Sequence, residues 1–349
     1  MSYQNDMSPE LKEKMKKNLV YVGIFSIIML FAGLTSGYYV SMGKSFWLKY
    51  PMPNGFIFST LFIALSSLSF WLAIFFAKRD NQTRLKGAML ATLIFGGSFV
   101  YFQFSGYGEL VDRGVNPVND ILVVNGRYGD YFQFKYKGNL VGVDGNEYLI
   151  NGTPISEQTF LKIQQYFNQF EKISRQAPLK IKDANPDFEL LYKDSPVLIK
   201  NNLLYINDST QMTFSDELRL YELSINIRDK RGDFFAKGTY GKDFTIYYGG
   251  KKLEYKNRKL YYNGTALKPY MQLSAMESAD SASSYLYLIT FVHLLHVIIA
   301  LLYLLKVAFA TFKGRYSSQN TLSLRLSSIF WHFLGLLWLY LLAFLIFIH

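Results

Sequence analysis

The stretch FVHLLHVIIALLYLL, residues 291–305, holds two of the chain's four histidines inside an otherwise apolar run. Its length and surroundings predict a membrane-spanning helix at 284–308, because about 20 mostly apolar residues cross a bilayer. Four further stretches share this character and have no acidic or basic residue in their interior: 18–42, 55–77, 86–106 and 325–348. The chain is therefore expected to be an integral membrane protein with an all-α bundle of five transmembrane helices.

The formal net charge of +11 lies mostly in the membrane part. Residues 105–280 carry 23 Lys and Arg against 22 Asp and Glu, so that region is nearly neutral. The excess basic residues precede helix one or lie between helices two and three or four and five: Lys12, Lys14, Lys16, Lys17, Lys78, Arg79, Arg84, Lys86, Lys306, Lys313, Arg315 and Arg325. Because short basic loops stay in the cytoplasm, we expect a cytoplasmic N-terminus and an outer C-terminus. Nucleic-acid binding has no support.

Cysteine is absent, which excludes disulfides, iron–sulfur clusters and thiolate-bound copper formed by this chain. The first apolar segment is too long for the core of a signal peptide and lacks a clear cleavage site, so we expect it to be retained. These features predict three parts: helices one to three in 1–106, an extracytoplasmic insert in 107–280, and helices four and five in 281–349.

The insert alternates short aromatic and β-branched runs with turn signals. Asn-Gly, Asp-Gly and Gly-Gly pairs in LVVNGRYG, VGVDGNEYLINGTPI and IYYGGKK predict β-hairpins. Two amphipathic stretches, TFLKIQQYFNQFEKI and SDELRLYELSINI, are compatible with helix or extended chain. These signals predict a mainly β insert of the α+β class. It contains no His, Cys or Trp, which argues against a haem or copper centre there.

An internal repeat organises the insert. The elements YLINGT, LYINDS and LYYNGT place Asn151, Asn207 and Asn263 at equal intervals along the chain. Aromatic residues upstream keep the same spacing: Phe132, Phe188 and Phe244, and Tyr136, Tyr192 and Tyr248. A fixed period is typical of stacked or pseudo-symmetric copies with a shared core, so we predict three tandem units. Asn-Gly-Thr is also a glycosylation signal, but its recurrence at hairpin positions favours turns with positive φ.

The histidines allow two interpretations. His293 and His296 lie one helical turn apart, and His332 lies in IFWHFLGLLWLYLL. A metal centre requires more ligands, and the spanning segments offer no carboxylate for a di-iron site. Neutral imidazoles that bond across helices or face lipid are the favoured interpretation.

These motifs together resemble subunit III of the haem-copper terminal oxidases. His293, His296, Val297 and Ala300 match its His-x-x-His-Val-x-x-Gly pattern, with Ala in place of Gly. The next helix matches Trp-His-Phe-x-Asp-x-x-Trp through Trp331, His332, Phe333 and Trp338, with Gly335 where the family has Asp. Upstream, Ser66, Ser67 and Gln103 match two further family segments. The helix at 18–42 lacks the family's membrane carboxylate.

The resemblance implies a non-catalytic accessory subunit in the five-helix bacterial form, located in the inner membrane. It would support the assembly, lipid binding and stability of a proton-pumping core. Its expected partners are oxidase subunit I, subunit II, membrane lipids and, through the insert, a small subunit or the electron donor's complex. Haem and copper are expected in the partner subunits and not in this chain. The residues expected to bind lipid or pack helices are His293, His296, Trp331, His332, Trp338, Gln103, Ser66 and Ser67, with Arg79 and Arg84 as headgroup candidates.

The sequence is also compatible with two other functions. The chain could be a membrane anchor or receptor whose repeat domain binds a ligand, or a transporter, although no spanning segment contains proline or an interior charge. Two smaller expectations concern helix one and its outer end. Gly33 and Gly37 are expected to allow close helix packing. Tyr38, Tyr39 and Trp47 are expected to anchor the chain at the outer interface.

Overall fold

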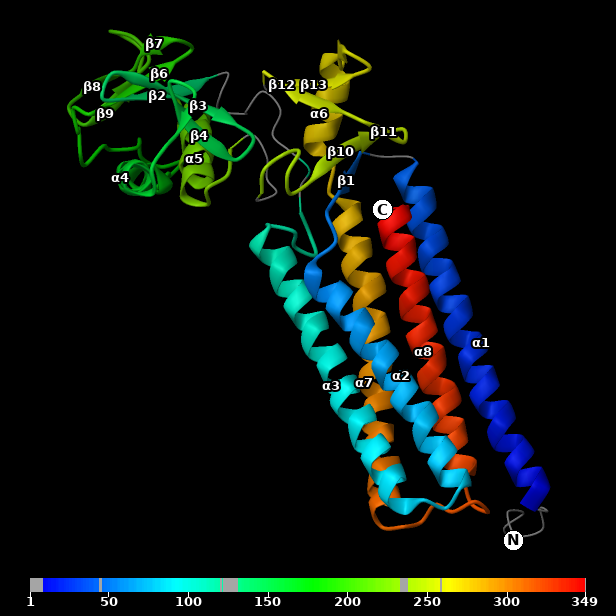
Figure 1. Ribbon diagram of the computed structural model, residues 1–349. Helices are drawn as coiled ribbons and strands as arrows, with labels where there is room; N and C mark the ends of the chain where they lie inside the picture. The colour runs from blue at the N-terminus through cyan, green and yellow to red at the C-terminus, as the bar shows by residue number, and fades with distance from the viewer. Residues whose placement is uncertain are drawn as a thin grey trace. The chain divides into compact units, whose positions relative to one another are not determined.

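The computed structural model describes residues 9–43, 46–119, 121, 131–232, 238–257 and 259–348. The chain divides into two compact units (Figure 1). The membrane unit comprises Met1–Met42, Pro51–Asp112 and Ala282–His349, and the β unit comprises Gly43–Tyr50 and Arg113–Ser281.

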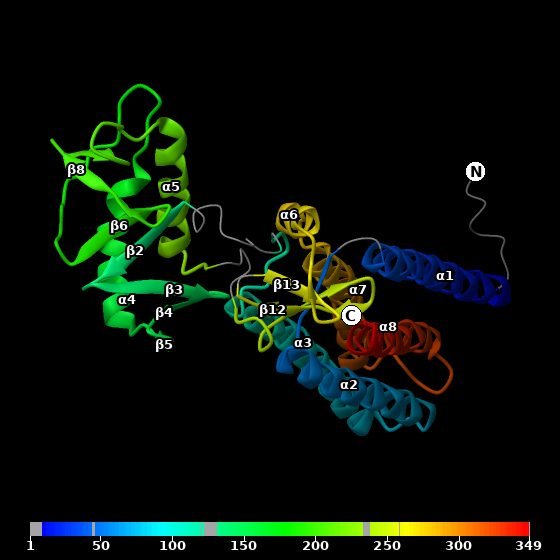
Figure 2. The ribbon, with the colours of Figure 1, turned by 90° about the horizontal axis from the view of Figure 1, so that it is seen from above.

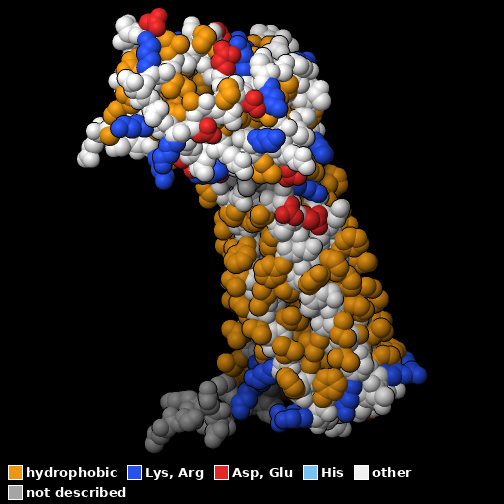
Figure 3. Space-filling view, turned by 90° about the vertical axis from the view of Figure 1, so that its left-hand side faces the viewer, with side chains coloured by type: hydrophobic (Ala, Val, Ile, Leu, Met, Phe, Trp, Pro, Cys, Tyr) orange, Lys and Arg blue, Asp and Glu red, His pale blue; other side chains and the backbone are white. Residues whose placement is uncertain are grey.

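Five helices of the membrane unit are long and apolar enough to cross a bilayer, which confirms the five predicted spans. They are α1 (Pro9–Met42), α2 (Asn54–Lys78), α3 (Gln82–Asp112), α7 (Ser281–Phe312) and α8 (Leu322–Phe347). Four of them extend several residues beyond the predicted apolar spans, because helical hydrogen bonding continues into polar flanking sequence. Apolar side chains cover the helices. Basic side chains gather at the end of the helices where the α2–α3 and α7–α8 loops lie (Figure 3).

Those two loops are joined by hydrogen bonds. The side-chain amide of Gln82 donates to the carbonyl of Tyr316 at 2.7 Å, and the backbone N–H of Ser318 donates to the Asp80 carboxylate at 2.6 Å. The bonds from Ser318 hold the pKa of Asp80 below its usual value. The loops therefore fix the ends of α2, α3, α7 and α8 together.

The first part of the β unit is a six-stranded antiparallel sheet with helices packed against it. The sheet has the order β5-β4-β3-β2-β6-β7. Its elements are β2 (Phe132–Tyr136), β3 (Asn139–Asp144), β4 (Glu147–Ile150), β5 (Thr153–Pro154), β6 (Phe188–Tyr192) and β7 (Ser195–Pro196). A two-stranded hairpin and the helices complete this part: β8 (Leu198–Lys200), β9 (Leu203–Tyr205), α4 (Glu157–Phe167), the 3₁₀ helix η1 (Asn168–Glu171) and α5 (Phe214–Arg228). Both ambiguous amphipathic stretches are thus helical.

An aromatic core joins this sheet to its helices. It is drawn from residues between Phe132 and Ile227 and is rich in phenylalanine and tyrosine. Phe134 of β2 lies edge-on to Phe167 of α4 at 4.7 Å between ring centroids. Burial of these apolar faces explains why α4 forms a helix, since a short helix gains most of its stability from packing.

The remaining strands form two smaller sheets, one of which can be followed in Figure 2 by the labels β12 and β13. One has the order β1-β10-β11 and the other β12-β13-β14. The elements are β1 (Trp47–Lys49), β10 (Thr245–Tyr248), β11 (Lys251–Lys252), β12 (Glu254–Lys256), β13 (Lys259–Tyr262), β14 (Thr265–Ala266) and α6 (Pro269–Glu277). Strand β1 belongs to the chain segment that joins α1 to α2, so the β unit includes residues from outside the predicted 107–280 insert.

The asparagine turns follow the prediction at two of three positions. Asn151 and Gly152 have φ values of 52° and 77°, and Asn263 and Gly264 have 50° and 75°, as a two-residue hairpin turn requires. The prediction is wrong for Asn207. Asp208 stands where the other copies have Gly, and there the Asn207 side chain instead accepts backbone N–H bonds from Ser209 and Thr210. The LVVNGRYG hairpin lies outside the described residues.

Two expectations for helix one and its outer end are wrong in part. Trp47 is fully buried in β1, and Tyr38 is fully buried against Tyr285 and Phe344 at 5.7 and 5.1 Å. Neither ring is free to anchor in a membrane interface, whereas Tyr39 is 60% exposed. In the Gly33-x-x-x-Gly37 pair, the structure places the Tyr285 ring, and not another helix backbone, close to Gly37.

Candidate functional site

The predicted site residues lie on α2, α3, α7 and α8. His293 of α7 is fully buried, and its Nε2–H donates to the backbone carbonyl of Leu334 on α8 at 3.0 Å. This bond crosses between helices as predicted. It also takes up a carbonyl oxygen of α8, and a polar ring in hydrocarbon requires such a partner.

The other two histidines have different surroundings. His296 is half-buried and donates from Nδ1 to the carbonyl of Val292 in its own helix at 2.7 Å. His332 of α8 is half-buried beside the Phe70 ring, 6.3 Å away. Over the described part of the chain, no group of three or more His, Cys, Asp or Glu side chains could hold a metal ion.

Two tryptophans of α8 connect this helix to α2. The Trp331 indole N–H donates to the Ser66 hydroxyl at 3.1 Å, and that hydroxyl donates to the Thr92 carbonyl of α3 at 2.9 Å. The Trp338 indole N–H donates to the Thr60 hydroxyl at 2.8 Å. Each indole thus buries a large apolar ring while its single polar atom has a partner on α2.

The remaining matched residues lie along the same helix contacts. The Gln103 amide of α3 donates to the Ser59 hydroxyl at 2.8 Å, and both side chains are fully buried. A Cβ built on Gly335 would lie 3.2 Å from the Ser67 hydroxyl oxygen. The family's aspartate would therefore meet α2 directly at this position.

The junction of α2 and α3 was not predicted from the sequence. A Cβ built on Gly55 would lie 2.5 Å from the backbone nitrogen of Gly106, so the two helix backbones touch there. The Glu109 carboxylate accepts the backbone N–H bonds of Asn54 and Gly55, both at 2.8 Å, at the N-terminus of α2. A negative charge at a helix N-terminus is stabilising. The position of Glu109 in the sequence does not indicate that it caps a different helix.

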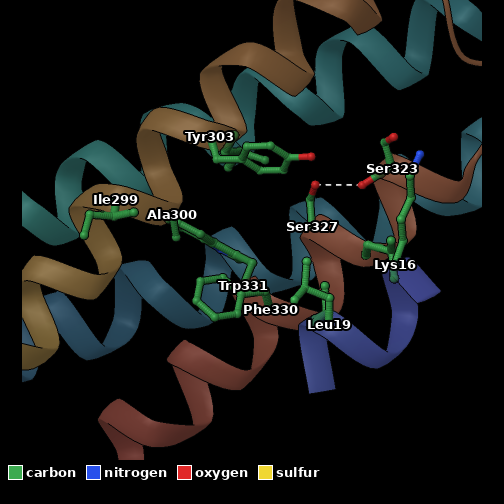
Figure 4. Close-up of a pocket in the computed structure, with 12 residues that line it drawn as sticks. Lys16, Leu19, Ile299, Ala300, Tyr303, Ser323, Ser327, Phe330 and Trp331 are labelled. Carbon is green, nitrogen blue, oxygen red and sulfur yellow. Dashed lines mark hydrogen bonds between the residues drawn. The ribbon is translucent and has the colours of Figure 1, made fainter. Parts of the chain in front are cut away.

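A hollow lies between α1, α7 and α8 (Figure 4). It has a volume of about 500 Å³, and apolar side chains provide most of its lining. Lys16 and Leu19 come from α1, Tyr303 from α7, and Phe330 and Trp331 from α8. The Ser327 hydroxyl, which faces this hollow, donates to the Ser323 carbonyl at 2.7 Å.

A second hollow of about 690 Å³ lies next to the first, since Tyr303 and Ser323 line both. It is more polar and is lined by Lys306, Lys313 and Arg315. An apolar slot next to a cluster of cations has the chemical character required for an acyl chain and a phosphate.

The two predicted headgroup arginines lie elsewhere. The Arg79 guanidinium stacks 4.0 Å from the Phe75 ring centroid, and Arg84 lies 5.8 Å from Phe76. Neither lines the two hollows. The cations that line the hollows are Lys16, Lys306, Lys313 and Arg315. From the sequence they were interpreted only as signals of membrane orientation.

Comparison with known proteins gives one match. The family model for cytochrome c oxidase subunit III matches residues 258–349, which include α6, α7 and α8. No curated protein and no solved structure matches the chain. The matched segment contains the His-x-x-His-Val and Trp-His-Phe motifs, and its tryptophans make the contacts to α2 described above. The resemblance seen in the sequence is thus confirmed for this part of the chain: residues 258–349 are similar to cytochrome c oxidase subunit III.

Proposed function

We propose that this protein is a non-catalytic accessory subunit III of a haem-copper respiratory oxidase, which supports the assembly and stability of a proton-pumping core. The observation that carries the proposal is the use of the family motif residues. In a segment that matches the family, the indoles of Trp331 and Trp338 and the imidazole of His293 bond to neighbouring helices. Such residues brace a scaffold, and the redox groups belong to partner subunits.

The same proposal includes anionic phospholipid as a ligand. The apolar hollow would hold an acyl chain, and Lys16, Lys306, Lys313 and Arg315 would neutralise the headgroup phosphate. The charge pattern favours a cytoplasmic position for this end of the helices in a bacterial inner membrane. The β unit would then face the outside and contact subunit II, a small subunit or the donor's complex.

We also infer that the β unit contains three related repeats. Strands β2, β6 and β10 begin at Phe132, Phe188 and Thr245, and helices α4, α5 and α6 begin at Glu157, Phe214 and Pro269. Both series keep nearly the same interval as the three asparagines. A corresponding backbone bond occurs in each repeat, from Ile155 to Tyr148, from Met212 to Leu204 and from Leu267 to Leu260, with the donor one residue later in the second repeat.

Purification tests the oxidase proposal. An affinity-tagged chain, extracted from its native membrane in mild detergent, should co-migrate with a haem-containing subunit and show its visible spectrum. Recovery without haem would overturn the proposal. His296→Ala should loosen subunit association or lipid retention and leave the haem spectrum unchanged, whereas an altered spectrum would indicate a ligand role.

Lipid retention is tested separately. A variant in which Lys306, Lys313 and Arg315 are replaced by Gln should retain fewer anionic lipids, measured by mass spectrometry of the detergent-purified protein. The matched control replaces Arg79 and Arg84, which lie outside the hollows, and should retain the original amount. Equal retention in both variants would contradict this site.

A further inference from the structure

Strands β2 and β6 pair in a self-complementary way. Phe132 lies opposite Tyr192 and Tyr136 lies opposite Phe188, with ring centroids 5.2 and 5.1 Å apart. Just beyond the strands, the backbone N–H of Lys137 donates to the backbone carbonyl of Asp187 at 2.7 Å. The backbone N–H of Lys193 donates to the backbone carbonyl of Tyr131 at 2.8 Å. Each of these four contacts recurs when each residue is exchanged for its equivalent in the other repeat. Two like strands therefore pair about an approximate two-fold axis.

The first strand of the third repeat pairs with β1. Leu48 lies opposite Ile246, Trp47 opposite Tyr247 and Lys49 opposite Thr245. Aromatic rings again lie in contact at both ends of the strand pair. The ring centroids of Phe46 and Tyr248 are 4.8 Å apart, and those of Tyr50 and Phe244 are 6.4 Å apart. The pairing has the same pattern as the β2–β6 pair, with a phenylalanine next to a tyrosine at each end.

The four segments share one sequence pattern. They are FWLKY at 46–50, FQFKY at 132–136, FELLY at 188–192 and FTIYY at 244–248. Each begins with Phe, ends with Tyr and has an apolar residue in the middle. The middle residues are all buried: Leu48, Phe134, Leu190 and Ile246. Residues 46–50 therefore match the pairing strands of the three repeats in sequence, register and contacts.

We propose that β10 is a strand-binding site for a Phe-x-apolar-x-Tyr strand and that residues 46–50 are its built-in ligand, a fourth pairing strand. The proposal rests on the inferred repeat and not on the oxidase assignment. Backbone bonds along an edge supply affinity in this mode of recognition, and alternate side chains supply specificity. Here the middle apolar residue and the two end rings supply that specificity.

The position of this ligand strand in the chain gives the site a role in assembly. Residues 46–50 belong to the α1–α2 connection, whereas β10 follows much later in the chain, after α3 and the first two repeats. Among the described residues, the first strands of the first two repeats pair with each other, and the first strand of the third repeat pairs with β1 instead. The folding of the third repeat therefore depends on the connection between the first two membrane helices.

Cysteine cross-linking tests the register, and the absence of native cysteine makes it clean. Lys49→Cys with Thr245→Cys places two thiols on directly opposed residues. Added oxidant should form an intramolecular disulfide in the purified full chain, as it should for the control pair Lys135→Cys with Glu189→Cys in β2 and β6. Lys49→Cys with Tyr247→Cys should not react, because diagonal neighbours are about 7–8 Å apart. Absence of the first cross-link, or a disulfide-linked dimer in its place, would overturn the proposal.

Hydrogen exchange tests the specificity. Leu48→Ile, which copies the middle residue of β10, should leave the amides of residues 245–248 protected. Leu48→Asp should raise their exchange at least tenfold and leave those of residues 132–136 unchanged. Phe46→Ser, which removes an end ring, should raise exchange at residues 245–248 by a smaller factor. Unchanged protection of β10 in Leu48→Asp would overturn the proposal. Haem co-purification is read separately, so failure here is distinguishable from failure of the oxidase assignment.

Discussion

The membrane unit and the β unit are stabilised by different chemistry. In the membrane unit, buried serine, threonine, glutamine, histidine and tryptophan side chains bond from one helix to another, as at Trp331 and Ser66. In the β unit, an aromatic core such as the Phe134–Phe167 contact fills the space between sheet and helices. The difference follows from the solvent. Water drives apolar burial, whereas lipid provides no such drive and leaves packing and hydrogen bonds to hold helices together.

The largest expected effect lies in the aromatic core. Phe170 is fully buried and contacts the Phe167 and Tyr166 rings at 5.5 and 5.6 Å. Phe170→Ala should lower the free energy of unfolding of the β unit by about 3–5 kcal/mol, because it leaves a cavity. Hydrogen exchange of the β2 and α5 amides measures it. Leu161→Ala, at a position 50% exposed on α4, is the control and should change stability by less than about 0.5 kcal/mol. Equal losses in both variants would contradict a core centred on Phe170.

Backbone contact between α2 and α3 gives the next effect. Gly55→Ala would place its methyl group 2.5 Å from a backbone nitrogen of α3, so the helices must separate. We expect a loss near the upper end of about 1–3 kcal/mol, measured by thermal unfolding in detergent. Gly97→Ala on α3 is the control, because no atom lies within 4 Å of its added Cβ. A Gly55 variant as stable as the control would mean that the helices do not touch there.

A buried carboxylate provides a polar contact within the apolar core region of the β unit. The Glu217 carboxylate accepts the backbone N–H of Leu179 at 2.8 Å, and burial raises the pKa of Glu217. Glu217→Ala leaves that N–H without its partner and should cost about 1–3 kcal/mol. Glu217→Gln retains an acceptor oxygen and should cost much less, measured by exchange of the Leu179 amide.

The raised pKa also fixes the sign of a pH effect. The folded state binds the Glu217 proton more tightly than the unfolded state does. This contribution to stability is complete below the unfolded pKa and is lost as the pH rises through the folded pKa. Glu217→Gln should remove this part of the pH dependence, and a variant with an unchanged profile would contradict it.

Local sequence signals predicted the elements that depend on local chemistry. The five spans follow from long apolar runs, and the turns at Asn151 and Asn263 follow from Asn-Gly pairs that favour positive φ. The turn at Asn207 differs because Asp replaces Gly there. Strand β1 was missed because so short a strand between two helices has no periodicity, and its partner β10 lies far away in the sequence.

The candidate site was predicted by residue type but not by partner. His293, Trp331, Trp338, Gln103 and Ser66 all lie in interhelical contacts, yet only the fold reveals that the two indoles bond to α2. The cations near the apolar hollow come from α1 and α7 and from the loop after α7. Neighbours on different helices leave no trace in spacing along the chain, so this group of cations could not be predicted from the sequence.

The smallest effect tests the polar contacts of the membrane unit. Trp331→Phe keeps most of the buried ring and removes the N–H that donates to Ser66. Hydrogen bonds between membrane helices contribute about 0.6 kcal/mol on average and rarely more than about 1.7 kcal/mol. A double-mutant cycle with Ser66→Ala isolates the pair, because Ser66 also bonds to the Thr92 carbonyl. Thermal unfolding in detergent should give a coupling energy within that range. A value near zero would mean that Trp331 contributes to the contact between α8 and α2 through its ring alone, and at this position the membrane unit would then be held by packing, as the β unit is.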